Sequence, residues 1–267
     1  MTNAVRSLGS LAGIIIAVIL SVCPGMAARA QHLQLPNAPV RIALIQGSGD
    51  EAGLQIQLSP GWKFYWRTPG EGGVPAQFDW TASRNVTRVD VAWPAPRRIL
   101  IGKTEIYGYG GEVVLPLRVE RLDSGVPYGL DLMLEYGVCK DICILRNDRL
   151  LLRSQDSAST QNQLLIAKWR ARVPQPAAQA GVQLVSHRLK PDRLMVTLQS
   201  QTPLHEPELF VEGAPDSWFG RPVVNLAANG QEVRFDLPAT YSPDKANQLL
   251  RLTLVDRALQ AELVLPP

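Results

Sequence analysis

Two of the three cysteines lie four residues apart, in the segment Tyr136-Gly137-Val138-Cys139-Lys140-Asp141-Ile142-Cys143. An extended strand would hold their Cα atoms about 13 Å apart, whereas a disulfide needs roughly 4.4–6.8 Å. A bond therefore requires the chain between them to turn back, or the pair to share one helical turn. The alternating segment from Leu130 to Tyr136 predicts a strand, so we expect a turn at a strand end.

Three kinds of chemistry are open to this pair: reversible redox exchange, a structural bridge and metal binding. A bond that closes so short a loop restricts the unfolded chain by only about 2 kcal/mol, which favours exchange over a purely structural role. Two thiolates make a poor zinc site, which normally has three or four protein ligands. His32, His187 and His205 are scattered through the chain, so we expect neither a metal site nor a cofactor.

The N-terminus has the pattern of an export signal, with a basic Arg6, an apolar run from Leu11 to Val22, and the small-x-small sequence Ala28-Arg29-Ala30 before Gln31. The apolar run is shorter than the roughly 18–20 residues that span a bilayer, which favours cleavage over an uncleaved anchor. Cys23 would be lost with the signal. A lipoprotein box ending at Cys23 is a weaker alternative, because bulky Val22 stands where a small residue is expected.

The predicted mature chain is almost neutral. Removal of residues 1–30 takes away Arg6 and Arg29 and no acidic residue, so the formal charge falls from +3 to +1. Such a balance gives no electrostatic reason to expect nucleic acid or anionic lipid as a partner. No other segment is apolar enough to cross a membrane, and a disulfide fits an exported protein.

Composition and periodicity predict an all-β fold. The 21 glycines and 21 prolines leave little room for long helices. One helix is expected at 159–173, capped by Ser159 or Thr160 and ended by Pro174, with a linker at 174–178. Beyond it, six short strands predict a second sandwich-like domain. The expected segments are a signal peptide at 1–30, a first β-sandwich at 31–157, a helix and linker at 158–176, and a second β-sandwich at 177–267.

Aromatic residues are concentrated just before the loop that starts at Pro69. Trp62, Phe64, Tyr65 and Trp66 follow a turn at Ser59-Pro60-Gly61. Packing in the core and rim of a sandwich is one interpretation of this cluster. The other is a partner-docking surface, because aromatic residues are common anchors of interfaces.

Residues from about Ala38 to Leu152 resemble the N-terminal periplasmic domain of the DsbD family of thiol:disulfide interchange proteins, and its ScsB-type branch in particular. The segment from Gly102 to Tyr107 is similar to the family's loop and strand ahead of the active cysteines. Val113-Val114-Leu115-Pro116-Leu117 is similar to the strand that follows, and Tyr136-x-x-Cys139-Lys140-Asp141-Ile142-Cys143 to the redox pair. The order and spacing of these elements together carry the resemblance.

The resemblance implies an immunoglobulin-like β-sandwich in the periplasm, whose catalytic cysteines would be Cys139 and Cys143. It also implies a cap over the pair, and by position Leu100 and Ile101 fall where this cap would lie. The aromatic and acidic residues usual there are replaced by Arg98, Ile99, Leu100 and Ile101, which puts capping and acid-assisted proton transfer in doubt. Three tyrosines are candidates for shaping the pocket, with sandwich core as the alternative: Tyr107, Tyr109 and Tyr136.

The leading hypothesis is a thiol–disulfide exchange module that relays reducing equivalents. Its implied partners are periplasmic thioredoxin-like or disulfide-isomerase-like proteins and a membrane electron donor, because family members usually continue into a transmembrane and a thioredoxin-like domain. The first alternative is a non-catalytic binding module with a structural disulfide. The second is a copper-tolerance accessory protein, which the absence of Met or His clusters disfavours as a direct metal binder.

Overall fold

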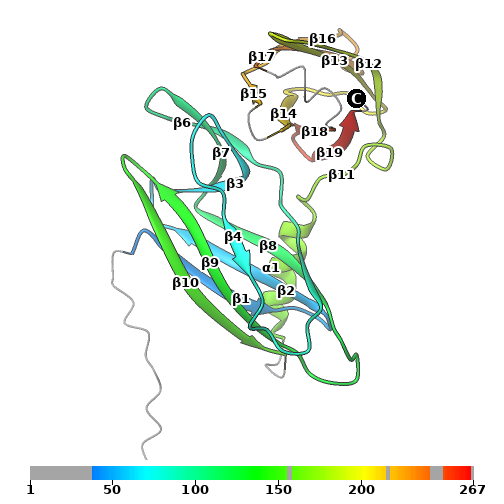
Figure 1. Ribbon diagram of the computed structural model, residues 1–267. Helices are drawn as coiled ribbons and strands as arrows, with labels where there is room; N and C mark the ends of the chain where they lie inside the picture. Colours follow the sequence, from blue (N-terminus) through cyan, green and yellow to red (C-terminus); the bar gives the residue numbers. More distant parts are fainter. Residues whose placement is uncertain (1–37, 155–157, 215–216, 241–248, 266–267) are drawn as a thin grey trace, which may run out of the picture. The chain divides into compact units, whose positions relative to one another are not determined.

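The computed structural model describes residues 38–154, 158–214, 217–240 and 249–265 (Figure 1). The expected signal peptide, its cleavage point before Gln31, and Cys23 lie outside the described residues. Within the described ranges the regular structure is β except for one helix, and the strands form two sandwiches of two sheets each. This confirms the prediction of an all-β chain with two immunoglobulin-like sandwiches.

The N-terminal sandwich contains the first ten strands. Its first sheet has the order β1-β2-β8-β5, formed by β1 (Val40–Gln46), β2 (Glu51–Leu58), β8 (Glu112–Glu120) and β5 (Arg88–Val91). Its second sheet has the order β10-β9-β3-β7-β6, with β4 paired to β9, and is formed by β10 (Cys143–Arg153), β9 (Gly129–Cys139), β3 (Lys63–Gly70), β7 (Thr104–Gly110), β6 (Arg97–Ile101) and β4 (Gln77–Asp79). The cysteines are in the second sheet, at facing ends of β9 and β10.

Alternation along the strands builds the core of this sandwich. Leu54, Ile56 and Leu58 of β2 are all buried, as their period of two predicts. Leu130, Leu132 and further alternate residues of β9 are buried opposite them and belong to the same hydrophobic cluster. The core therefore lies between the two sheets.

Helix α1 (Thr160–Arg170) closes one side of the N-terminal sandwich. The Ser159 hydroxyl accepts a hydrogen bond from the Asn162 amide at 3.1 Å, so Ser159 is the N-cap. Ile166 and Trp169 are buried in the core, and the helix packs against β8 and β1. The prediction of one helix here is confirmed, with its end four residues before Pro174.

The described residues of the C-terminal sandwich form nine strands. One sheet has the order β11-β19-β18-β14, formed by β11 (Gln175–Pro176), β19 (Leu259–Leu265), β18 (Leu250–Asp256) and β14 (Glu208–Glu212). The other has the order β12-β13-β17-β15, with β16 paired to β17, and is formed by β12 (Val182–Lys190), β13 (Arg193–Ser200), β17 (Glu232–Thr240), β15 (Trp218–Phe219) and β16 (Val223–Leu226). All six strands expected here exist. The sequence missed β15, β16 and β11, and the last of these falls within the expected linker.

A buried aromatic side chain joins the two sandwiches, which belong to one compact unit of the chain. Phe210 comes from β14 of the C-terminal sandwich but is buried in the N-terminal core. Its ring centroid lies 6.0 Å from that of Trp66 and 5.0 Å from that of Tyr107, both in edge-to-face arrangements. The packing of the N-terminal sandwich therefore depends on a residue from the other sandwich.

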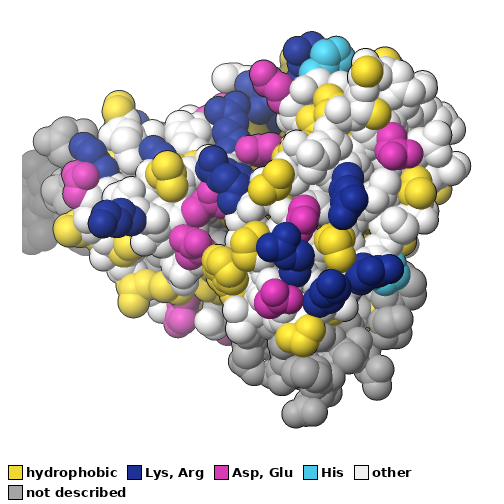
Figure 2. All heavy atoms as spheres, turned by 90° about the horizontal axis from the view of Figure 1, so that it is seen from above, with side chains coloured by type: hydrophobic (Ala, Val, Ile, Leu, Met, Phe, Trp, Pro, Cys, Tyr) yellow, Lys and Arg dark blue, Asp and Glu magenta, His cyan; other side chains and the backbone are white. Residues whose placement is uncertain are grey.

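Charged side chains are mixed over the surface. Figure 2 shows basic and acidic groups interspersed with hydrophobic ones over the face that it displays. This agrees with the near balance of 27 basic and 24 acidic residues in the whole sequence. None of the described helices is both long and apolar enough to span a bilayer.

Replacing Phe210 tests the aromatic packing between the two sandwiches, which we call the aromatic seam. Phe210→Ala should lower the free energy of unfolding by about 3–5 kcal/mol, because it leaves a cavity among buried rings. Denaturant unfolding followed by tryptophan fluorescence measures the loss. Val223→Ala is the control, since Val223 is 64% exposed in the same sandwich and should cost no more than about 0.5 kcal/mol. Equal losses for the two variants would contradict the buried seam.

Candidate active site

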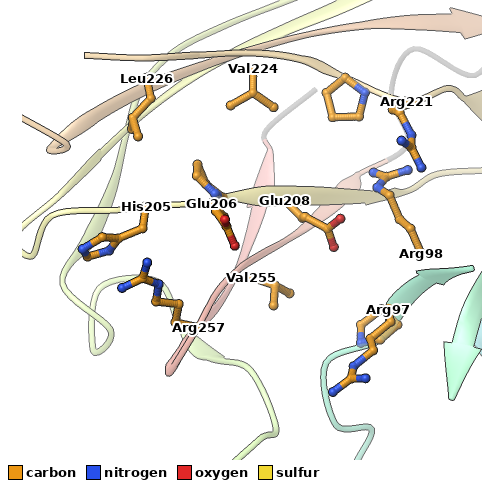
Figure 3. Close-up of a pocket in the computed structure, with 13 residues that line it drawn as sticks. Arg97, Arg98, His205, Glu206, Glu208, Arg221, Val224, Leu226, Val255 and Arg257 are labelled. Carbon is orange, nitrogen blue, oxygen red and sulfur yellow. The ribbon is translucent and has the colours of Figure 1, made fainter. Parts of the chain in front are cut away.

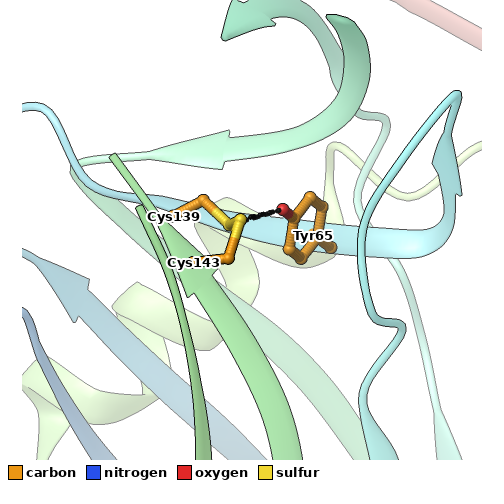
Figure 4. Close-up of a disulfide and its surroundings, with 3 residues drawn as sticks. All are labelled: Tyr65, Cys139 and Cys143. Atoms are coloured by element: carbon orange, nitrogen blue, oxygen red, sulfur yellow. Dashed lines mark hydrogen bonds between the residues drawn. A yellow bond between two sulfur atoms is a disulfide. The ribbon is translucent and has the colours of Figure 1, made fainter. Parts of the chain in front are cut away.

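The two cysteines face each other across a hairpin. Strands β9 and β10 pair antiparallel with Cys139 directly opposite Cys143. The amide of Lys140 donates to the carbonyl of Ile142 at 3.1 Å and closes the turn. The Cα atoms of the cysteines are 4.1 Å apart and the sulfurs are bonded (Figure 4). The expected turn at the end of the strand is confirmed. Strand β10 begins at Cys143 itself.

The two sulfurs have unequal surroundings. Cys139 is fully buried and packs with Tyr65 and Ile106, against which Ile99 and Ile101 also pack. Cys143, the first residue of β10, is exposed. Cys143 is therefore open to solvent, whereas Cys139 is shielded.

Tyr65 is the polar group at the disulfide. Its hydroxyl lies 2.6 Å from Cys139 Sγ and 3.3 Å from Cys143 Sγ (Figure 4). Because bonded sulfurs carry no hydrogen, the tyrosine O–H is the donor. Burial raises the pKa of Tyr65 above its ordinary value, so the phenol keeps its proton at neutral pH.

Strand alternation explains why Tyr65 reaches the sulfurs. Its neighbours Phe64 and Trp66 point into the sandwich core, so Tyr65 points to the opposite face of β3. The pairing of Lys63 with Cys139 brings β3 beside the end of β9. Tyr65 belongs to the aromatic cluster noted in the sequence and is not among the predicted site residues. The period of two within that cluster is the signal that distinguishes it.

Two glycines make room for the Tyr65 ring. A Cβ on Gly73 would lie 2.3 Å from a ring carbon of Tyr65, and Gly73 has a φ of 137°. A Cβ on Gly137 would lie 3.3 Å from the opposite edge of the ring. The ring is therefore held between two backbone segments without Cβ atoms, which fixes the direction of its hydroxyl.

The residues expected at the cap are in the hairpin of β6 and β7. Ile101 packs against the cluster of Tyr65, Ile106 and Cys139, together with Ile99. Leu100 is 64% exposed and points away from this cluster. Alternation along β6 thus divides the two expected cap residues between its two faces.

The other three expected pocket residues are tyrosines whose side chains are buried in the core of the N-terminal sandwich. The hydroxyl of Tyr109 donates to the carbonyl of Pro94 at 2.6 Å, and that of Tyr136 to Asp148 Oδ2 at 2.6 Å. The hydroxyl of Tyr107 lies 3.2 Å from Arg98 Nη1. Burial raises the pKa of all three phenols.

The described residues contain no group of three or more His, Cys, Asp or Glu side chains that could hold a metal ion. The chemistry that this arrangement offers is that of one exposed sulfur, one buried sulfur and a hydrogen-bond donor on the buried one.

The part of the chain that carries the two cysteines matches a known family. Residues 29–155 match the family described as thiol:disulfide interchange protein DsbD, N-terminal. The chain carries a DsbD N-terminal domain. Residues 172–267 match a family described only as a domain of unknown function (DUF8393). The DsbD match ends just beyond β10, so both cysteines belong to it.

A solved structure resembles nearly the whole chain. The crystal structure of the N-terminal periplasmic domain of ScsB from Proteus mirabilis is 25% identical, with a TM-score of 0.71. The similarity covers 88% of this chain and 96% of that one, so it includes both sandwiches. A search of curated proteins found no match.

Replacing Gly73 tests the packing that holds Tyr65. Gly73→Ala should displace the ring and break the hydrogen bond to Cys139, at a cost of about 1–3 kcal/mol in unfolding free energy. A crystal structure of the variant and denaturant unfolding measure the two effects. Gly102→Ala is the control, because Gly102 also has a positive φ, of 61°, but nothing lies within 4 Å of its added Cβ. If the Tyr65 ring kept its position in Gly73→Ala, the proposed role of Gly73 in holding it would be contradicted.

Proposed function

We propose that this protein is an exported thiol–disulfide exchange module that relays reducing equivalents between periplasmic proteins through Cys139 and Cys143. The observation that carries the proposal is the unequal burial of the two sulfurs in a DsbD-type domain. A bridge that served only to pin a turn would have no need of one accessible sulfur and one shielded sulfur with its own donor.

The geometry supports one order of events. A donor thiolate attacks the exposed Cys143 Sγ, the S–S bond breaks, and Cys139 leaves as a thiolate. The Tyr65 hydroxyl, already 2.6 Å from this sulfur, donates a hydrogen bond to the new charge. The second thiol of the same donor then attacks the donor sulfur that is bonded to Cys143. A disulfide forms within the donor, which becomes oxidised, and Cys143 is released in the reduced form.

Onward transfer is the reverse. The Cys143 thiolate attacks a disulfide in the acceptor and forms a mixed disulfide with one acceptor sulfur, while the other acceptor sulfur leaves as a thiolate. Cys139 then attacks Cys143 Sγ, restores the intramolecular disulfide and releases, as a thiolate, the acceptor sulfur that was bonded to Cys143. Two electrons pass to the acceptor, and Cys139 needs to meet no sulfur except that of Cys143.

Apolar side chains surround the exposed sulfur. Ile142 in the turn is 67% exposed, and Leu145, on the same face of β10 as Cys143, is 70% exposed. Exposed apolar groups next to a reactive atom are typical of a docking surface. They support docking of another protein at Cys143. From the DsbD-type match we propose thioredoxin-like or disulfide-isomerase-like proteins and a membrane electron donor as partners. From the similarity to a periplasmic domain and the export pattern of the N-terminus we propose a location in the periplasm after cleavage of residues 1–30. We place the exchange domain at 31–157, the helix and linker at 158–176, and the second sandwich at 177–267.

The redox potential tests the exchange chemistry. Equilibration with glutathione buffers should give a midpoint between roughly −120 and −270 mV, the range of exchange proteins. Mass spectrometry after rapid alkylation measures the fraction reduced. A midpoint below about −300 mV would be that of a structural bridge and would refute the proposal.

Single-cysteine variants test the relay. Cys139→Ser leaves the exposed thiol and should accumulate mixed disulfides with partners in the periplasm, because nothing resolves them. Cys143→Ser leaves only the shielded thiol and should accumulate far fewer. Non-reducing gels followed by mass spectrometry of the trapped species give the comparison. Equal trapping by the two variants would show that the sulfurs do not have the assigned roles.

A further inference from the structure

The elements that cover Cys139 are both anchored to the C-terminal sandwich. One is the hairpin of β6 and β7, which carries Ile99, Ile101 and Ile106. The other is β3, which carries Tyr65. Each has a buried or half-buried charged residue that binds groups of the C-terminal sandwich.

The hairpin is anchored through Glu105, a residue only 8% exposed at the start of β7. Its carboxylate binds Arg98 of the same hairpin and Arg221 of the C-terminal sandwich, with distances of 2.8 Å from Arg221 Nε and 2.7 Å from Arg221 Nη2. Arg98 and Arg221 both line a hollow of about 840 Å³. Figure 3 shows the two side chains next to each other. One carboxylate therefore connects the two sandwiches.

Arg98 makes a second connection. Its side chain is 5% exposed, and its guanidinium donates to the carbonyl of Leu209 in the C-terminal sandwich. The same guanidinium lies over the rings of Phe210 and Tyr107, at 4.8 and 5.0 Å from their centroids. The base of the hairpin is thus fixed to the C-terminal sandwich by both charge and packing.

Strand β3 is anchored two residues beyond Tyr65. Arg67 binds Glu212 with 2.9 and 2.6 Å contacts and Glu262 at 2.5 Å, and both carboxylates belong to the C-terminal sandwich. The hydroxyl of Thr68 adds a 2.8 Å bond to Glu212.

The loop after β3 connects the two anchored elements, β3 and the β6–β7 hairpin, by hydrogen bonds. The backbone amide of Glu71 donates to the carbonyl of Glu105 at 3.0 Å, and the Glu71 carboxylate accepts from the amide of Glu105 at 2.9 Å. This loop continues to Gly73, which lies against the Tyr65 ring. Glu105 therefore connects the C-terminal sandwich, the hairpin and the loop beside Tyr65.

We propose that the C-terminal sandwich keeps the β6–β7 hairpin closed over Cys139, with Glu105 and Arg221 as positioning residues. This inference rests on the proposed function, because shielding of Cys139 ensures that foreign sulfurs meet Cys143 alone. The proposal gives the C-terminal sandwich, which matches the domain of unknown function, a role in the exchange site. This role is indirect, because it acts through the hairpin and not through contact with the sulfurs.

Alkylation of single thiols tests this shielding directly. All proteins carry Cys23→Ser, and either Cys143→Ser or Cys139→Ser, so that one thiol remains. Arg221→Gln should raise the rate at which iodoacetamide modifies Cys139 by about two- to fivefold, the factor expected from loss of a partly exposed ion pair. The rate at the exposed Cys143 should not change. Arg221→Glu, which places a second carboxylate beside Glu105, should raise the Cys139 rate further.

A matched variant separates positioning from general loss of stability. Arg193 pairs with Asp236 at 3.0 Å within the C-terminal sandwich and is similarly exposed, so Arg193→Gln should leave both alkylation rates unchanged. Hydrogen–deuterium exchange gives the second readout, and in Arg221→Gln the amides of residues 97–110 should exchange faster while β13 and β17 stay as in the wild type.

Four results would overturn the proposal: an unchanged Cys139 rate in Arg221→Gln, an equal rise at Cys143, an equal rise in Arg193→Gln, or unchanged exchange at residues 97–110. These readouts do not depend on transfer of electrons. Failure of the exchange function would appear instead in the redox potential, with the shielding of Cys139 intact.

Discussion

The pairing register of β9 and β10 is the constraint on which the site depends. It places Cys139 directly opposite Cys143, with three residues between them to make the turn. A shift of one residue would move one cysteine to the other face of the sheet, because side chains alternate along a strand. Buried residues on both strands resist such a shift, since it would turn either Leu130, Leu132 and Leu134 of β9 or Leu152 of β10 out of the core. The hydrophobic core therefore sets the geometry of the disulfide.

The same alternation makes the two sulfurs chemically different. It turns Tyr65 away from Phe64 and Trp66 and toward the sulfurs, and it turns Ile99 and Ile101 inward while Leu100 faces solvent. The result is a buried sulfur with a hydrogen-bond donor and an exposed sulfur with apolar neighbours. In a disulfide that is opened by attack on one sulfur, this difference decides which sulfur is attacked and which one leaves.

Burial of charged side chains between the two sandwiches costs free energy, and the pairing of these charges offsets that cost. Burial of a carboxylate such as Glu105 is unfavourable unless it is paired and hydrogen-bonded. Two guanidinium groups satisfy Glu105, one from each sandwich, and two carboxylates of the C-terminal sandwich satisfy Arg67. Such pairs add little to net stability compared with apolar packing, but they fix orientation. The buried Phe210 supplies the apolar part of the same seam.

Local patterns in the sequence were enough to predict most of the regular elements and to single out the cysteine pair. Strong periodicity in β2, β9, α1 and six strands of the C-terminal sandwich predicted their positions, because local patterns record which face is buried. The spacing of Cys139 and Cys143 at the end of an alternating strand predicted a turn between them. The environment of the sulfurs, in contrast, depends on how the chain folds in three dimensions. Tyr65, Gly73 and Glu105 are far from the cysteines in sequence, and Arg221 and Phe210 belong to another sandwich. Contacts between distant segments depend on how strands pair and sheets pack, and no local pattern records that.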